Sequence, residues 1–227
     1  LYPKNLIAFI KDKFLFGLKN SHNNVHVLYN GIERPLKKFP TKKKEILFVG
    51  RLVKEKGVDI YVKAISNIAQ MFPEWKFYII GSSHLGVKSE KNFFVNKLLN
   101  DFYKIGNQAS FEGFMSYDNV QEKMKTASII VVPSVWHEPF GLVVAEAMSN
   151  GIAVITSNVG GIPEIIGNNG IKINNINEIK IENELIGLIN DKHKLNHLQK
   201  LSWNNFSMTA KKSSLILDQH RKNIIFS

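Results

Sequence analysis

Short apolar runs alternate with amphipathic stretches along most of the chain. From residue 45 onward, runs rich in Ile, Val, Leu and Phe are bounded by Gly or Pro, and most are followed by segments whose apolar residues recur at helical spacing. This pattern predicts strands at 46–49, 76–80, 109–112, 129–132, 153–156 and 170–173. It predicts helices at 57–71, 90–103, 117–126, 141–149, 178–190, 192–201 and 205–226.

The predicted strands are apolar on both faces, which is typical of a parallel sheet covered by helices on both sides. The sequence therefore predicts an α/β fold with a Rossmann-like parallel sheet. Ligands of such sheets bind at the carboxyl ends of the strands. The loops that carry the chemistry are accordingly expected to begin at Gly50, Gly81, Gly113 and Pro133.

The first thirty residues form a small piece of their own. They combine helical spacing at 6–18 with a short apolar run at 25–28, too little chain to bury its own apolar face. We expect this piece to be the tail of a largely absent preceding domain. The predicted organisation is 1–30 as that tail with the start of a linker, 31–44 as a lysine-rich linker, 45–203 as the ligand-binding domain, and 204–227 as a helix that leans on the preceding domain.

Composition narrows the class of protein. The 227 residues are 44% hydrophobic and include no Cys. The lack of Cys excludes a disulfide scaffold, a thiolate zinc site and a thiol nucleophile, and favours a reducing compartment such as the cytoplasm. The longest apolar runs have the length of a strand, so no membrane-spanning helix is predicted.

The charge balance indicates an acidic partner. Lys and Arg number 30 against 19 Asp and Glu, which gives a net charge of +11. Nucleic acid, an anionic membrane face or a phosphate-bearing small molecule would each suit this charge. Only three of the bases are arginines and no RRM-type motif occurs, so nucleic acid is not expected.

The loop after the first strand presents two cations, Arg51 and Lys56, close to the start of a predicted helix. Arg offers a planar fork to phosphate oxygens and Lys a mobile point charge, so together they suit a diphosphate. A solvated loop with chance lysines is the competing interpretation. That interpretation explains Lys56 better than Arg51, because arginine is rare in this chain.

The loop at 133–141 leads into a helix predicted to begin near Phe140 or Gly141, whose unpaired amides form a seat for an anion. Glu138 precedes this seat, and Glu146 lies about 8 Å along the helix axis. One carboxylate would accept hydrogen bonds from sugar hydroxyls and the other from a ribose diol. Capping by Glu138 and a lysine partner for Glu146 are the ordinary alternatives, but Glu146 lies in an apolar stretch where an ionised group needs a partner.

These residues resemble a known family. Pro-Ser-x-x-x-Glu-Pro-Phe-Gly-Leu-x-x-x-Glu-Ala-Met at 133–148 is similar to the signature of the group 1 (family 4) retaining glycosyltransferases. Asn-Gly-Ile at 30–32, Val-Gly-Arg at 49–51 with Lys-Gly at 56–57, Gly-Phe at 113–114 and Gly-Gly-Ile-Pro-Glu at 160–164 also resemble the family, in the family's order. The resemblance implies the carboxyl-terminal, donor-binding half of a GT-B fold.

The resemblance implies that a sugar passes from a nucleoside diphosphate sugar to an acceptor hydroxyl with retention of configuration. Arg51 and Lys56 would hold the diphosphate and stabilise the leaving nucleotide. Glu138 would contact hydroxyls of the donor sugar, and Glu146 the ribose. Arg51, Lys56 and Glu138 are therefore the expected catalytic residues, with Glu138 in a binding role. Glu146 belongs to the expected donor-binding residues.

Other donor-binding positions follow from the same resemblance. The amides of Gly141 and Leu142 would cap a phosphate, and Phe114 with Met115 would surround the base. The full set of expected donor-binding residues is Gly50, Gly81, Phe114, Met115, Phe140, Gly141, Leu142 and Glu146.

No metal and no further cofactor are expected, because no Asp-x-Asp occurs and the two cations would replace a metal. The donor would carry UDP or GDP. The expected acceptor is a saccharide or glycolipid, as in polysaccharide or lipopolysaccharide synthesis, with cytoplasmic location and peripheral contact with an anionic inner membrane face. A noncatalytic nucleotide-sugar or anionic-surface binding module and a sugar-nucleotide epimerase remain the alternatives.

Overall fold

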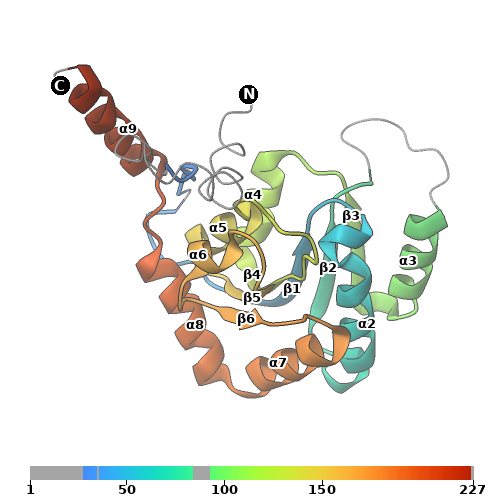
Figure 1. The fold of residues 1–227 in the computed structure, drawn as a ribbon. Helices are drawn as coiled ribbons and strands as arrows, with labels where there is room; N and C mark the ends of the chain where they lie inside the picture. Colours follow the sequence, from blue (N-terminus) through green and yellow to red (C-terminus); the bar gives the residue numbers. More distant parts are fainter. Residues whose placement is uncertain (1–27, 35, 84–92, 226–227) are drawn as a thin grey trace.

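The structure is a computed structural model, and it describes residues 28–34, 36–83 and 93–225. The predicted helix at 6–18, most of the apolar run at 25–28 and the first residues of the helix predicted at 90–103 lie outside this part. A six-stranded sheet forms its centre (Figure 1). The strands are β1 (Lys43–Val49), β2 (Lys76–Ile80), β3 (Ala109–Gly113), β4 (Ala127–Val132), β5 (Ala153–Ser157) and β6 (Ile171–Ile173).

All neighbouring strands run parallel, in the order β3-β2-β1-β4-β5-β6. This confirms the predicted Rossmann-like parallel sheet. The crossovers from β1 and from β4 leave in opposite directions along the sheet, so the carboxyl ends of these two adjacent central strands form a topological switch point. The helices are α2 (Val58–Ile68), α3 (Phe93–Tyr103), α4 (Tyr117–Thr126), α5 (Leu142–Ser149), α6 (Ile162–Ile166), α7 (Glu178–Asn190), α8 (Lys192–Asn205) and α9 (Ala210–Ile225).

Two buried clusters lie on opposite faces of the sheet. Ile46 and Phe48 of β1 pack with α2, α3 and α7, whereas Leu47 between them packs with α4, α5 and α6 on the other face. Alternation along one strand therefore supplies both cores, as the two-residue side-chain period of a strand requires. Helices packed on both faces of the sheet hold the ends of the strands in place.

Several predicted boundaries were wrong. β1 begins at Lys43, inside the segment predicted as linker, because its first polar residues pair with the sheet at its exposed end. The helix predicted at 57–71 is α2, from Val58 to Ile68, followed by the 3-10 turn η3 (Ala69–Met71).

The carboxyl-terminal helices also differ from the prediction. α8 continues to Asn205, and the last helix, α9, begins only at Ala210 rather than at 205. The short helix α6 was not predicted, because its five residues, with Pro163 in the first turn, are too few to show a period. These differences concern the ends of elements and one short element, not the layers of the fold.

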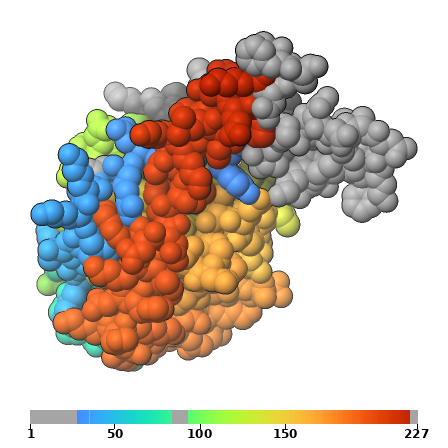
Figure 2. Space-filling model, turned by 90° about the vertical axis from the view of Figure 1, so that its left-hand side faces the viewer, coloured from blue at the N-terminus to red at the C-terminus, as the bar shows by residue number. Residues whose placement is uncertain are grey.

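The segment before β1 packs against the carboxyl-terminal part of the chain. The amide of Ile32 donates to Met208 O at 2.9 Å, and the amide of Ala210 donates to Ile32 O at 3.3 Å. The guanidinium of Arg34 lies 3.7 Å from the centre of the Trp203 ring. Figure 2 shows this segment, in blue, beside α8 and the start of α9, in orange and red.

Candidate functional site

A cavity of about 330 Å³ opens where β1 and β4 end side by side. This is the switch point at which an open parallel sheet binds its ligands. Its walls come from the loops that follow the two strands, from the start of α5 and from the segment before β1. The lining residues are Asn30, Phe48, Val49, Gly50, Arg51, Lys56, Val132, Glu138, Pro139, Phe140, Gly141, Leu142 and Val143.

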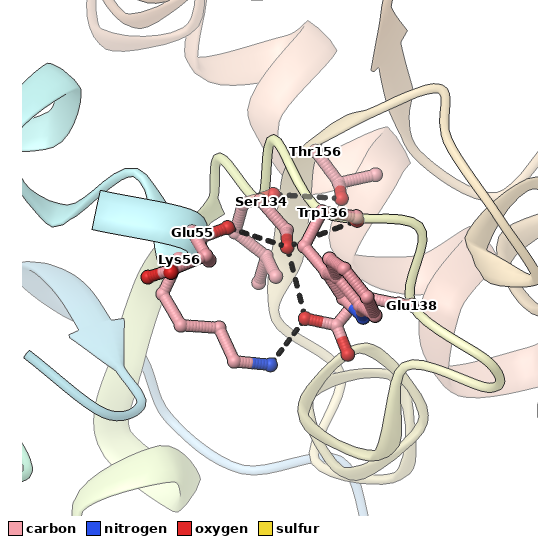
Figure 3. Close-up of polar contacts among 7 residues, drawn as sticks. Glu55, Lys56, Ser134, Trp136, Glu138 and Thr156 are labelled. Atoms are coloured by element: carbon pink, nitrogen blue, oxygen red, sulfur yellow. Dashed lines mark hydrogen bonds and ion pairs between the residues drawn. The ribbon is translucent and has the colours of Figure 1, made fainter. Parts of the chain in front are cut away.

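The loops after β1 and β4 are tied together at one carbonyl. Glu55 O accepts hydrogen bonds from the amides of Val135 and Trp136, at 3.0 and 3.2 Å, and it lies 3.1 Å from Ser134 Oγ (Figure 3). Gly57 makes this contact possible: its φ is +67°, and a Cβ there would lie 2.0 Å from Pro133 O. The side chains of the two loops are consequently held in a fixed relation.

Lys56 and Glu138 form an ion pair between these loops (Figure 3). Ser134 Oγ donates to the same carboxylate oxygen, Oε1, at 2.9 Å. The Glu138 side chain is only 13% exposed, so its negative charge needs these partners. Among the described residues Oε2 has no partner, and this oxygen is therefore available to a hydroxyl group of a ligand.

The start of α5 adds positive potential to the cavity. Gly141 is its N-cap residue, with φ +89°, and no described side chain caps the helix. The amides of Leu142 and Val143 are thus left without an intrahelical acceptor, and both residues line the cavity. Together with the helix dipole they favour an anion at this point. Arg51, exposed at the cavity wall, adds a full charge.

Glu146 borders the cavity rather than lining it. It lies one turn beyond Leu142 and Val143 on α5, and residues three and four apart share a helix face. Burial raises the pKa of its carboxyl from 4.5 to about 7. Burial, and then the charge of Glu146, also raise the pKa of Tyr117, so these two side chains lie near each other. The Glu146 carboxylate has no hydrogen-bond partner among the described residues.

The structure brings most of the predicted site residues together and leaves four outside the cavity wall. Those in the wall are Gly50, Arg51, Lys56, Glu138, Phe140, Gly141 and Leu142. Gly81 lies outside the wall and packs against the backbone of Gly50, since a Cβ there would lie 1.8 Å from Gly50 O. Phe114 and Met115 follow β3, two strands away from β1, and with Glu146 they do not line this cavity. Their contact with a ligand stays a prediction.

Some residues of the site were not predicted. Ser134 had a signal, since it follows Pro133 directly in the motif, but only the fold shows that its hydroxyl joins Glu55 to Glu138. Asn30 was noted only as part of the Asn-Gly-Ile motif at 30–32 and not as a site residue, yet it lines the cavity. The other residues of the wall are Phe48, Val49, Val132, Pro139 and Val143. Val49 and Pro139 lie in the motifs at 49–51 and 133–148, whereas nothing in the spacing of Phe48, Val132 and Val143 distinguishes them from ordinary core or loop positions.

The described part of the chain shows neither a metal-binding cluster nor a membrane-spanning helix. Within 28–34, 36–83 and 93–225, no group of three or more His, Cys, Asp or Glu side chains lies close enough to hold a metal ion. Among the helices of the same ranges, none has the length and apolar character needed to cross a bilayer.

Known proteins resemble this chain in sequence and in fold. The profile of the family described as "Glycosyl transferases group 1" matches residues 30–204. The uncharacterized glycosyltransferase MJ1178 of Methanocaldococcus jannaschii is 32% identical over 204 residues, which cover 86% of this chain and 54% of that protein. The lipopolysaccharide 1,2-N-acetylglucosaminetransferase of Salmonella typhimurium is 30% identical over 121 residues, 53% of this chain and 32% of that enzyme.

A solved structure shares the fold. Anabaena Alr3699/HepE in complex with UDP and glucose superimposes with a TM-score of 0.73 at 21% identity, over 87% of this chain and 57% of that chain. The present chain thus spans about half the length of such relatives, or less. Because the family profile covers most of the sequence and the sheet has the fold of GT-B enzymes, the chain belongs to the group 1 glycosyltransferases.

Proposed function

We propose that the chain is the donor-binding half of a retaining glycosyltransferase that transfers a sugar from a UDP-sugar to an acceptor hydroxyl. One observation carries the proposal: a single cavity joins Arg51, Lys56 and the amino end of α5 to the carboxylate of Glu138. Positive groups suit a diphosphate, and a carboxylate beside them suits the hydroxyls of the attached sugar.

The diphosphate would lie against Arg51 and the first amides of α5. The ion pair with Glu138 holds Lys56 in the cavity wall, where its ammonium group would meet a phosphate oxygen. Negative charge develops on the diphosphate as the bond to the sugar breaks, and donors that are fixed in advance stabilise that charge without reorganisation. In this proposal the cations replace a metal, and the donor is the only small molecule that the site requires.

The identity of the nucleotide rests on likeness to solved structures. Anabaena Alr3699/HepE has this fold and was solved with UDP and with UDP-glucose, which makes UDP the first choice and GDP the second. Glu146 would accept hydrogen bonds from the ribose hydroxyls, beyond the phosphates along α5. Phe114 and Met115 would lie toward the base.

The acceptor would be a saccharide or glycolipid, bound between this chain and a preceding domain. Support comes from a relative that acts in lipopolysaccharide synthesis by its name and from the net charge of +11, which favours peripheral contact with an anionic membrane face. Cytoplasmic location and retention of configuration belong to the same proposal.

The proposal is tested by thermal denaturation of the chain with UDP, UDP-glucose and GDP. A ligand at 100 times its Kd stabilises the folded state by about 2.7 kcal/mol, which for a chain of this size raises Tm by about 5–10 °C. We expect such a rise with UDP and UDP-glucose, and ATP, which carries more negative charge than either, serves as the control anion. The proposal is wrong if no uridine or guanosine nucleotide raises Tm more than ATP does.

Binding of UDP-glucose should depend on pH through Glu146. Burial raises the pKa of this carboxyl to about 7, and only the ionised form accepts hydrogen bonds from both ribose hydroxyls. Because the diphosphate of UDP-glucose is esterified at both ends and does not titrate near neutrality, we expect its affinity to rise as pH increases from 6 to 8. Calorimetry on the wild type and on Glu146→Gln measures the effect, and the variant should show no such rise.

Without ligand, pH should affect stability in the opposite direction: the free energy of unfolding should fall as pH rises. A carboxyl whose folded-state pKa is raised stabilises the fold fully below its unfolded pKa of 4.5, and this contribution is lost as pH rises through about 7. Glu146→Gln should lose less free energy of unfolding than the wild type over the same interval. An identical pH profile of UDP-glucose affinity in both proteins would contradict the ribose assignment.

A further inference from the structure

The indole of Trp136 is 57% exposed, although it lies only two residues before the nearly buried carboxylate of Glu138. Figure 3 shows the indole extending toward that carboxylate. The other two tryptophans are covered: Trp75 is 4% exposed, and the guanidinium of Arg34 lies over the ring of Trp203. Trp136 is therefore the tryptophan whose ring is open to a ligand, and it lies beside the charged groups of the site.

The backbone that carries this ring is fixed. The amides of Val135 and Trp136 both donate to Glu55 O, and Ser134 Oγ lies 3.3 Å from Trp136 O. The loop after Trp136 is fixed as well, because the amide of Gly161 donates to Glu138 O at 2.6 Å. A loop whose backbone is already fixed loses little further backbone entropy when a ligand covers its side chain.

Trp136 and Glu138 offer complementary chemistry on one loop. A carboxylate accepts hydrogen bonds from the hydroxyl edge of a sugar, whereas an aromatic face packs against the C–H groups that a pyranose ring presents on its flat side. Sugars need both contacts because one molecule carries both kinds of surface.

We propose that Trp136 packs against the transferred sugar of the donor and contributes to the discrimination between the nucleotide sugar and the free nucleotide. The inference rests on the proposed function, and it adds a sugar-contacting residue that is not among those of the cavity wall. The sugar would lie between the Trp136 ring and Glu138, while its diphosphate extends toward Arg51 and the start of α5.

The test compares the nucleotide with and without its sugar, and each variant is judged against the wild type with the same ligand. Calorimetry measures the affinity for UDP and for UDP-glucose or UDP-N-acetylglucosamine, whichever of the two binds the wild type more tightly. Trp136→Ala should bind UDP as the wild type does, and the UDP-sugar about five- to tenfold more weakly. Trp136→Phe should stay within about twofold for both ligands, because an aromatic face remains. Ile179→Ala, at a 63% exposed position on α7, is the matched control and should change neither affinity.

Intrinsic fluorescence supplies a second measurement. Because Trp136 is the most exposed of the three tryptophans, it should account for most quenching by acrylamide. We expect the UDP-sugar to reduce this quenching more than UDP does in the wild type, and Trp136→Phe to lose that difference while its melting temperature is unchanged.

The outcomes separate the inference from the proposed function. An unchanged affinity of Trp136→Ala for the UDP-sugar overturns the inference and leaves the proposed function standing. An equal loss for UDP and UDP-sugar also overturns it, because the ring would then support the loop or the nucleotide rather than the sugar. Absence of UDP binding to the wild type would instead contradict the proposed function, and the inference with it.

Discussion

Replacing Arg51 with alanine is expected to weaken binding of UDP by about 10- to 100-fold, because a hydrogen bond to a charged group contributes about 1.5–3 kcal/mol. The Arg51 side chain is exposed at the wall of the cavity, and its guanidinium has no partner among the described residues. The variant should therefore lose affinity without losing stability. Calorimetry gives the affinity and thermal denaturation without ligand gives the stability.

Two further variants decide what kind of contact Arg51 makes. Lys54→Ala removes one positive charge from the same loop, at an exposed residue that does not line this cavity, and should weaken UDP binding by less than about twofold. Arg51→Lys keeps the charge but loses the planar fork and should fall between wild type and Arg51→Ala. Equal losses in Arg51→Ala and Lys54→Ala would show that only the general positive potential matters, and the diphosphate assignment would then fail.

Replacing Gly57 with alanine should damage both the fold and the site. Its φ of +67° is unfavourable for a residue with a Cβ, and that Cβ would lie 2.0 Å from Pro133 O. The loops after β1 and β4 would be forced apart, and the contacts of Glu55 and Lys56 with the second loop would be lost. We expect a loss of about 3 kcal/mol in the free energy of unfolding and a fall in Tm of about 6–12 °C.

Gly106 provides the matched control for this variant. Its φ is +80°, yet a Cβ would meet no atom within 4 Å, so Gly106→Ala incurs the backbone cost alone, about 1 kcal/mol. Gly106→Ala should retain UDP binding, whereas Gly57→Ala should lose it even at temperatures where the protein is folded. If the two variants behave alike in both assays, the contact between Gly57 and Pro133 does not organise the site.

The strands of the sheet could be predicted because each one shows its hydrophobic pattern within a short stretch of sequence. The predicted range of β2 agrees with the structure at both ends, since a strand buried on both faces is a continuous apolar run bounded by polar residues and glycine. Prediction failed where local information is weak. The charged residues at the start of β1 do not look like a strand, and α6 is too short to show helical periodicity.

The site was predicted in its parts but not in its connections. Arg51 and Glu138 could be selected because residues of their type, next to strand ends and a helix start, match the chemistry of a diphosphate and a sugar. The ion pair of Lys56 with Glu138 joins residues 82 apart in the chain, and the hydroxyl of Ser134 reaches Glu55 across a similar separation. No period or motif in the sequence indicates such contacts.

The sequence by itself determined the alternation of strands and helices and the chemical groups that follow each strand. The tertiary structure alone decided which of those groups meet. Residue periodicity reports the surroundings of one element, whereas the approach of two loops depends on β1 lying next to β4 and on a glycine that lets their backbones touch. Glu146 illustrates the difference: its place in an apolar helix could be read from the sequence, but its raised pKa arises from its burial in the folded chain.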